Sequence, residues 1–108
     1  MIGNDVCKKS LKSLTTTEEF KKNILKLLNY LDETVPEGSH LLIFGLADGE
    51  LLYDNLHNDT HPLNVTYEAV YNFLNCLNIS PCWSWLNTNE TIRKYTTERA
   101  QNLSKVYQ

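Results

Sequence analysis

The chain has 108 residues, of which 42% are hydrophobic and 21% charged, a composition that predicts one folded globular unit and excludes a disordered tail. The net charge of -3 and a sequence pI near 5.5, without a run of basic residues longer than two, argue against a nucleic-acid partner. Met1 is not followed by a secretory leader, and no apolar stretch approaches the roughly 20 residues that cross a bilayer. We therefore expect neither a signal peptide nor a transmembrane segment in this chain.

The first elements expected are a strand end, a turn and a helix. Ile2 is expected at the end of a strand, and Gly3-Asn4-Asp5 after it favours a turn. Two overlapping capping boxes, at residues 15–18 and 16–19, open a helix over about residues 17–33 with its apolar side chains on one face. This helix is followed by turn-forming residues that end it.

The apolar run at residues 40–46 predicts a strand covered on both faces, as in a parallel sheet. With the preceding helix it forms a crossover unit, so the fold class is α/β. The next elements expected are a turn at 47–50, a polar loop from Asp54 to Leu63, and a helix capped by Thr66 over 67–77. After a break at 80–85, Asn87 with Glu90 opens a last helix. Along one side of that helix lie Ile92, Tyr95, Arg99, Leu103 and Val106. One complete strand cannot form a sheet, so we expect residues 1–108 to be part of a larger domain, incomplete at both ends.

Asn-x-Ser/Thr triplets and cysteines bear on the cellular compartment. Five such triplets occur, and the three with the better acceptor setting are at Asn58, Asn64 and Asn89, because Asn78 is followed by Pro81 and Asn102 falls in a predicted helix. The three cysteines are an odd number, so in an oxidising compartment one thiol must pair outside the segment. Free thiols in the cytosol are equally compatible with the composition.

Candidate site residues have competing readings. Gly3-Asn4-Asp5 is either a plain turn or a turn that presents the Asn4 amide to an oxyanion at the end of a parallel strand. Asp54 with His57 has the spacing of a base and its orienting carboxylate, although the wall of a polar loop is the simpler role. His57 and His61 do not share a regular helix, so no metal site is expected.

Aromatic and hydroxyl side chains add little catalytic signal. Trp83 and Trp85 lie in a predicted loop, where they could line an acyl pocket or form a small satellite core. None of the six serines has the neighbours of a nucleophile elbow or of a Gly-Asp-Ser turn. The residues by themselves therefore give no nucleophile.

The order of these pieces resembles the catalytic domain of the acyloxyacyl hydrolase family, within the Gly-Asp-Ser-Leu (GDSL), or SGNH, superfamily of serine esterases and lipases. The matching stretches cover nearly the whole chain: Ile2 to Cys7, Gly38 to His40 running through Phe44 to Leu46, Asp48-Gly49, Asp54 to Asn58, His61 to Leu63, Thr66-Tyr67, Phe73 to Leu77, Ser80 to Cys82, Glu98 to Ala100, and Leu103-Ser104. The stretches from Asp54 to Leu63 and from Phe73 to Cys82 are the more specific ones.

This resemblance implies a three-layer α/β/α, flavodoxin-like domain and an enzyme that removes secondary acyl chains from the lipid A part of lipopolysaccharide and related lipids. Asn4 would be the oxyanion-hole residue, with Gly3 as its turn, although the Gly usual two places before this Asn is replaced by Ile2. The family's Ser nucleophile and its Asp-x-x-His pair are absent from the chain, which we therefore expect to be inactive alone. Asp54, His57 and His61 would then belong to a loop on the substrate side.

The resemblance also implies partners and a compartment for the full-length protein. These are a saposin-like small subunit held by a disulfide, an acyl lipid or lipopolysaccharide substrate, and secretion or an endolysosomal location. It implies an internal Cys7–Cys82 bridge and assigns Cys76 to the other subunit. Calcium occurs in the family, but this segment shows no ligand cluster for it and no other cofactor is expected. A different class remains open, a secreted module without activity that binds lipid or protein through residues 54–63 or through Trp83 and Trp85.

Overall fold

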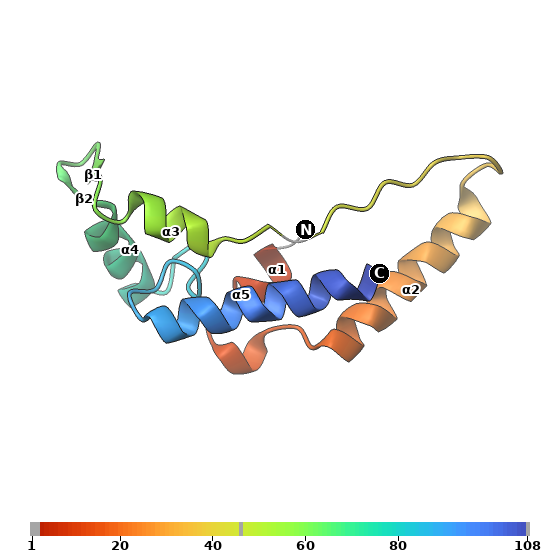
Figure 1. Ribbon diagram of the computed structural model, residues 1–108, viewed down its shortest axis with the longest axis horizontal. Coiled ribbons are helices and arrows are strands. Elements are labelled where there is room, and N and C mark those ends of the chain that lie inside the picture. Colours follow the sequence, from red (N-terminus) through yellow and green to blue (C-terminus); the bar gives the residue numbers. More distant parts are fainter. Residues whose placement is uncertain (1–2, 46, 108) are drawn as a thin grey trace.

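The computed structural model describes residues 3–45 and 47–107, which form a mainly helical structure with one small sheet (Figure 1). The longer elements are α2 (Thr17–Thr34), α4 (Tyr67–Cys76) and α5 (Glu90–Ser104). The shorter ones are α1 (Gly3–Val6), α3 (Glu50–Leu56), the strands β1 (Thr60–His61) and β2 (Val65–Thr66), and 3₁₀ turns at Leu11–Ser13 and Lys105–Tyr107. The two strands pair antiparallel, with Thr60 opposite Thr66 and His61 opposite Val65.

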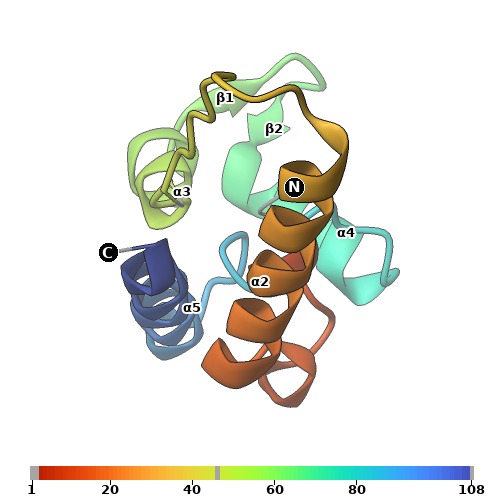
Figure 2. The same cartoon turned by 90° about the vertical axis from the view of Figure 1, so that its right-hand side faces the viewer.

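The helix predicted over residues 17–33 is confirmed as α2. Of the two possible caps, Thr16 is the one used, since its side chain accepts a hydrogen bond from the Glu19 amide at 3.1 Å. Phe20, near the start of α2, is buried, whereas Leu27 and Tyr30 in its later half are largely exposed. The helix is therefore held to the body by its first turns, and its later half projects from it (Figures 1 and 2).

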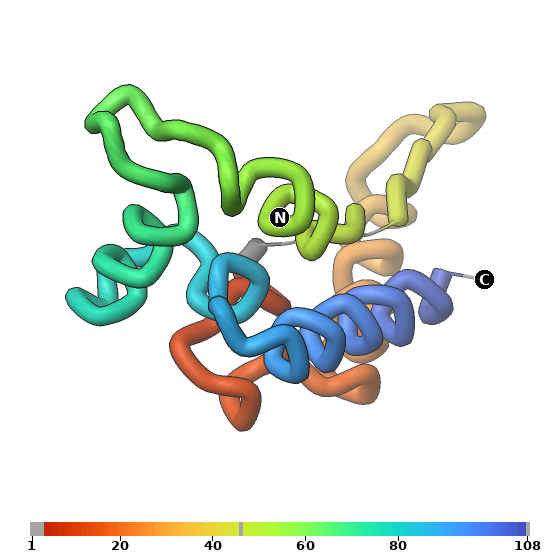
Figure 3. The backbone as a smooth tube through the Cα atoms, turned by 60° about the vertical axis from the view of Figure 1, so that its left-hand side comes forward, coloured from red at the N-terminus to blue at the C-terminus, as the bar shows by residue number. Residues whose placement is uncertain are grey.

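The strand predicted at 40–46 is not formed in the described part, residues 40–45, and Leu46 lies outside the described residues. The chain doubles back after α2 and crosses to α3 without regular secondary structure (Figure 3). Leu41, Leu42, Ile43 and Phe44 are all exposed there. A strand requires a hydrogen-bonded neighbour, and the one sheet among the described residues is β1–β2, so this apolar run remains unpaired.

Two further predictions are corrected by the structure. The turn expected at Gly3-Asn4-Asp5 is the one-turn helix α1, and the strand end at Ile2 lies outside the described residues. The polar loop expected from residue 54 is in part α3, whose N-cap is Gly49 and which follows a turn in which Asp48 accepts a hydrogen bond from the Glu50 amide at 3.0 Å. The remainder of that loop contains the β1–β2 hairpin.

Helix α4 begins at its predicted cap, Thr66, whereas α5 begins at Asn89 instead of Asn87. The buried face of α5 is not the side on which the sequence pattern aligned five residues, and the two have Leu103 in common. It consists of Arg93, Thr96, Thr97, Ala100 and Leu103. The prediction followed hydrophobicity, but the hydroxyls and guanidinium on this face find partners inside the fold and can therefore be buried.

The core lies where α1, α3, α5 and the 80–86 turn meet. Its fully buried side chains include Val6 and Leu103, and Tyr53, Trp85 and Leu86 complete it on the α3 side. The described molecule measures 54 × 28 × 23 Å and has a radius of gyration of 16.8 Å. A compact chain of this length would have about 13 Å. The elongation comes from the outer half of α2 and the returning apolar segment (Figure 1).

Candidate functional site

Asn4, the predicted oxyanion donor, lies on α1 with its side chain exposed. Its surroundings are rigidly anchored: Val6 is fully buried and its carbonyl accepts a 2.7 Å hydrogen bond from Ser84, while the Asp5 carbonyl accepts one from the Thr15 amide at 3.0 Å. The side-chain amide of Asn4 makes no hydrogen bond to another described residue. The structure thus presents a free amide on a fixed backbone, which is what a hydrogen-bond donor to a developing oxyanion requires.

A disulfide between Cys7 and Cys82 fixes the end of α1 to the 80–86 turn, 75 residues away in sequence. These are the two cysteines that the resemblance paired. Cys76, in the last turn of α4, has a free and exposed thiol.

Asp54 and His57 do not form a dyad, because each has another partner. The Asp54 carboxylate is 3.8 Å from the Arg93 guanidinium, and His57 donates from Nδ1 to the Tyr53 carbonyl at 2.9 Å. The His57 ring stacks on Tyr53 with the ring centroids 5.1 Å apart and the planes nearly parallel. His57 is therefore oriented by α3 itself and not by a carboxylate.

His61, on β1, belongs to the same aromatic cluster as His57. Its ring meets Tyr67 edge-on at 4.9 Å, and Tyr67 lies 5.9 Å from Tyr71, which in turn contacts Tyr53. Burial raises the pKa of the Tyr53 and Tyr71 phenols above the usual value of 10.0, with the Glu68 carboxylate adding to the rise at Tyr53. The predicted substrate-side residues are thus part of the packing between α3, the hairpin and α4.

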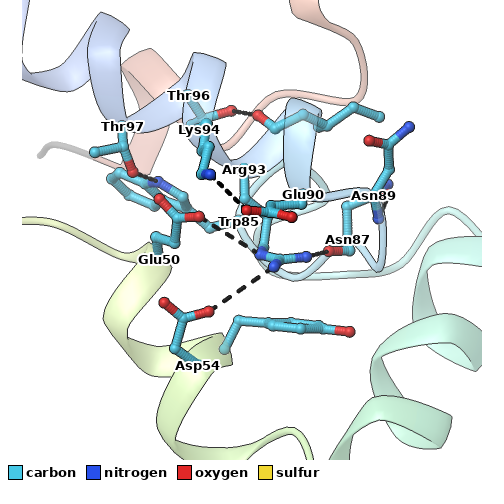
Figure 4. A network of polar contacts seen from close by, with 12 residues as sticks. Glu50, Asp54, Trp85, Asn87, Asn89, Glu90, Arg93, Lys94, Thr96 and Thr97 are labelled. Carbon is cyan, nitrogen blue, oxygen red and sulfur yellow. Dashed lines mark hydrogen bonds and ion pairs between the residues drawn. The ribbon is translucent and has the colours of Figure 1, made fainter.

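Arg93 is the residue that sequence reasoning missed, and it organises the polar core (Figure 4). Its guanidinium donates to the Asn87 carbonyl at 2.8 Å, lies 3.9 Å from the Glu50 carboxylate, and sits 4.0 Å above the Tyr53 ring. With 7% of its surface exposed it is a buried charge, which is tolerated because both carboxylates of α3, Glu50 and Asp54, face it. The signal available in the sequence was this pair of acids one helical turn apart.

The serine hydroxyls do not form a nucleophile site. Those of Ser13, Ser39, Ser84 and Ser104 each donate to a main-chain carbonyl, and Ser84 is fully buried. A serine nucleophile needs a general base within hydrogen-bond reach. The hydroxyls of Ser13, Ser39 and Ser84 make these bonds to carbonyls and not to a histidine.

Within the described residues, no three His, Cys, Asp or Glu side chains gather in a way that could hold a metal ion. None of the described helices is both long and apolar enough to cross a membrane.

Trp85 is in the core, where its Nε1 donates to Thr97 at 3.0 Å, and Trp83 is half-buried.

The fold and the Cys7–Cys82 bond define a disulfide-bonded, mainly helical unit. Comparison with known proteins narrows the class of protein further. Acyloxyacyl hydrolases of Homo sapiens, Oryctolagus cuniculus and Mus musculus are 47%, 46% and 43% identical to the chain over 96%, 97% and 96% of its length. No model of a protein family matches it.

The chain is accordingly homologous to one segment of the acyloxyacyl hydrolases. It spans about one fifth of the length of each of these curated relatives.

Proposed function

We propose that this chain contributes the Asn4 oxyanion donor and a supporting scaffold to a serine esterase of the acyloxyacyl hydrolase type. The observation that carries the proposal is the similarity of at least 43% identity over almost the whole chain to three enzymes of that name. The substrate class is an ester between one acyl chain and the hydroxyl of another, as in lipid A and related lipids. The assignment to the GDSL, or SGNH, superfamily rests on the motif resemblance around Asn4.

The role of Asn4 follows from how ester hydrolysis proceeds. Attack of a serine oxygen on the ester carbonyl places negative charge on the former carbonyl oxygen, and fixed N–H donors stabilise that charge. The Asn4 amide, exposed on a helix that the Cys7–Cys82 disulfide anchors, is suited to be one such donor. Because its backbone does not have to reorganise during the reaction, little free energy is lost in orienting it.

The nucleophile and the base would come from other parts of the longer protein. Ser13, Ser39 and Ser84 donate to main-chain carbonyls, and His57 and Asp54 are engaged elsewhere. We therefore expect no ester hydrolysis by residues 1–108 alone.

A three-layer sheet domain in the longer protein would also account for residues 41–44. Four consecutive apolar side chains in an extended segment point alternately to opposite faces, so a cover is needed on both faces as well as strands on the edges. In a parallel sheet, neighbouring strands would pair with the edges of this segment, and helices such as α2 would cover the faces. The groove of about 820 Å³ between the later half of α2 and residues 35–41 would be filled in that arrangement.

Cys76 is the position from which a small subunit would be held. Its thiol is free and exposed, and it shares one face of α4 with the exposed apolar residues Phe73 and Leu77. A disulfide to a saposin-like subunit would place that subunit against this face. Disulfides form in secreted and lysosomal proteins, and this is the compartment we assign to the full-length protein.

The test is an ester-hydrolysis assay on three preparations: residues 1–108, the protein from its natural open reading frame, and that protein with Asn4→Ala. We expect no turnover by the first, turnover by the second, and a kcat reduced about 100- to 1,000-fold in the third. The matched control is Asn23→Ala, an exposed Asn on α2, which should leave kcat unchanged. An unchanged kcat in Asn4→Ala would refute the role of Asn4. Turnover by residues 1–108 that survives purification would refute the proposal that the nucleophile and the base come from other parts of the longer protein.

A further inference from the structure

Positive charge is concentrated in the first quarter of the chain. Residues 1–26 contain six of the ten Lys and Arg residues but three of the thirteen Asp and Glu residues, so their formal charge is +3, whereas that of residues 27–108 is −6. The first half of α2, which belongs to this basic segment, lies at the surface of the molecule (Figure 2). An acidic chain with one basic region has a surface suited to an anionic partner.

Three lysines of α2 lie on one face of the helix. Lys21, Lys22 and Lys26 line a shallow hollow of about 1000 Å³ along α2, together with Leu25 and Tyr30. We call these five residues the lysine face. The three lysines are exposed, and none of them forms an ion pair with another residue in 3–45 or 47–107. Their charges are thus free to meet an external anion.

Apolar and aromatic side chains accompany the lysines. Leu25, near the middle of the hollow, is 50% exposed, and Tyr30 is 62% exposed. Glu18 and Glu33, the carboxylates of the hollow, stand at its two ends and leave the middle positive. Lysines around an exposed leucine and tyrosine are typical of a helix that lies on a lipid surface. The apolar groups and lysine stems enter the boundary between head groups and acyl chains, while the ammonium groups stay with the phosphates.

A second face of α2 holds the helix to the protein. Phe20 is buried there and Ile24 packs against the core, while Leu28 and Leu31 line the groove beside residues 35–41. In the sheet domain proposed above, this second face is the one that would be covered. The lysine face therefore stays accessible when the second face is covered.

We propose that the lysine face binds the anionic surface of a lipid aggregate or bilayer, with its ammonium groups on lipid phosphates and Leu25 in the interface. The inference rests on the proposed function, because the acyl-lipid substrate of an esterase is presented at such a surface. Each lysine near an anionic surface strengthens binding about fivefold, so the three together contribute about 100-fold. The lysine face holds the protein at the lipid surface and takes no part in breaking the ester bond.

Vesicle binding tests the proposal on the protein made from its natural open reading frame. Co-sedimentation gives the Kd for vesicles of equal parts phosphatidylcholine and phosphatidylglycerol, and for vesicles of phosphatidylcholine alone. Lys22→Gln with Lys26→Gln should weaken binding to the anionic vesicles about 25-fold. Lys94→Gln with Lys105→Gln removes two exposed charges elsewhere and should leave that Kd unchanged. Equal losses in the two double variants, or equal binding to both kinds of vesicle, overturn the proposal.

The apolar part of the lysine face has its own test. Leu25→Gln should weaken binding to the anionic vesicles about 10-fold, because less apolar surface is removed from water. That loss should persist at high salt, where the contribution of the lysines is screened. Leu52→Gln, on α3 with a nearly equal exposed fraction of 51%, is the matched control and should bind normally. An unchanged Kd in Leu25→Gln contradicts the placement of this face in a lipid interface.

Competition separates the lipid surface from other anions. Inorganic phosphate or polyglutamate should release no more protein from the anionic vesicles than sodium chloride of the same ionic strength does. Greater release by phosphate would indicate a site for a free anion, and greater release by polyglutamate a surface for an acidic protein. Either result overturns the lipid assignment.

Asn4→Ala distinguishes this proposal from the proposed function. It should bind the vesicles like the unsubstituted protein, because Asn4 is assigned to hydrolysis. A lower kcat in Asn4→Ala together with normal binding by the Lys22 and Lys26 double variant would refute the lysine face alone. Weakened binding by that double variant together with an unchanged kcat in Asn4→Ala would refute the role of Asn4 alone.

Discussion

The indole ring of Trp85 lies directly on Gly49: a β-carbon built at Gly49 would stand 2.3 Å from Cε3 of the ring. The contact joins the start of α3 to the core, and Trp85 is held there by its bond to Thr97, which also donates to Asp48 at 2.8 Å. A glycine is therefore required at this position for reasons of space.

Gly49→Ala should lower the free energy of unfolding by about 1 to 3 kcal/mol, because the Trp85 ring has to move out of its buried site. Urea denaturation followed by tryptophan fluorescence measures the change. Gly45→Ala is the control, since a β-carbon there would stand 3.6 Å from the Ser104 side chain, an ordinary contact distance. Equal stabilities of the two variants would show that the ring does not hold this position.

The Cys7–Cys82 disulfide closes a loop of 75 residues and should contribute about 4 kcal/mol by restricting the unfolded chain. Cys7→Ser with Cys82→Ser should lower the free energy of unfolding, measured by urea denaturation, by that amount. Cys76→Ser should leave it unchanged, because this thiol is exposed and unbonded. A loss of stability in Cys76→Ser as large as in the double variant would contradict the pairing.

Arg93→Ala should cost about 3 kcal/mol, since it leaves the carboxylates of Glu50 and Asp54 without their cation and the Asn87 carbonyl without its donor. Arg93→Lys should recover only part of that loss, because an ammonium group cannot reach all these partners at once. Lys94→Ala is the neighbouring control: Lys94 pairs with Glu90 on the exposed side of α5, and its removal should change the stability little.

Stability should fall at alkaline pH because of Tyr53 and Tyr71. Their pKa values are raised in the folded protein above 10.0, so folding favours the protonated phenols. This contribution is complete below pH 10 and is lost as the pH rises through the folded-state values. Tyr53→Phe with Tyr71→Phe should flatten the decline measured by urea denaturation across that range. Tyr30→Phe, at an exposed site, should leave the decline of stability with pH unchanged. A flattened decline in that variant would contradict the assignment of the effect to Tyr53 and Tyr71.

The sequence was sufficient where short-range signals decide the structure. The capping residues Thr16 and Thr66 set the starts of α2 and α4, because a cap bonds an amide two or three residues away. It was insufficient where partners are distant. The buried face of α5 depends on Arg93 meeting α3, and the predicted strand would need neighbouring strands, whereas the one sheet among the described residues is β1–β2. For the candidate site, the motif suggested Asn4, which stays a prediction, and the fold showed that Asp54 and His57 are engaged with other partners.

Leu42 and Leu63 give the sharpest test of whether residues 41–44 are covered in the longer protein. Their exposed fractions are nearly equal, at 75% and 72%, so Leu42→Asp and Leu63→Asp should be equally harmless to residues 1–108 alone. If residues 41–44 form a strand inside a sheet domain, Leu42→Asp in the full-length protein buries a carboxylate and loses the burial of a leucine, a cost above about 3 kcal/mol. Leu63→Asp, on the hairpin beside Asn64, should remain neutral. Secreted yield and thermal unfolding of the two full-length variants measure the difference, and equal behaviour would mean that nothing packs on residues 41–44.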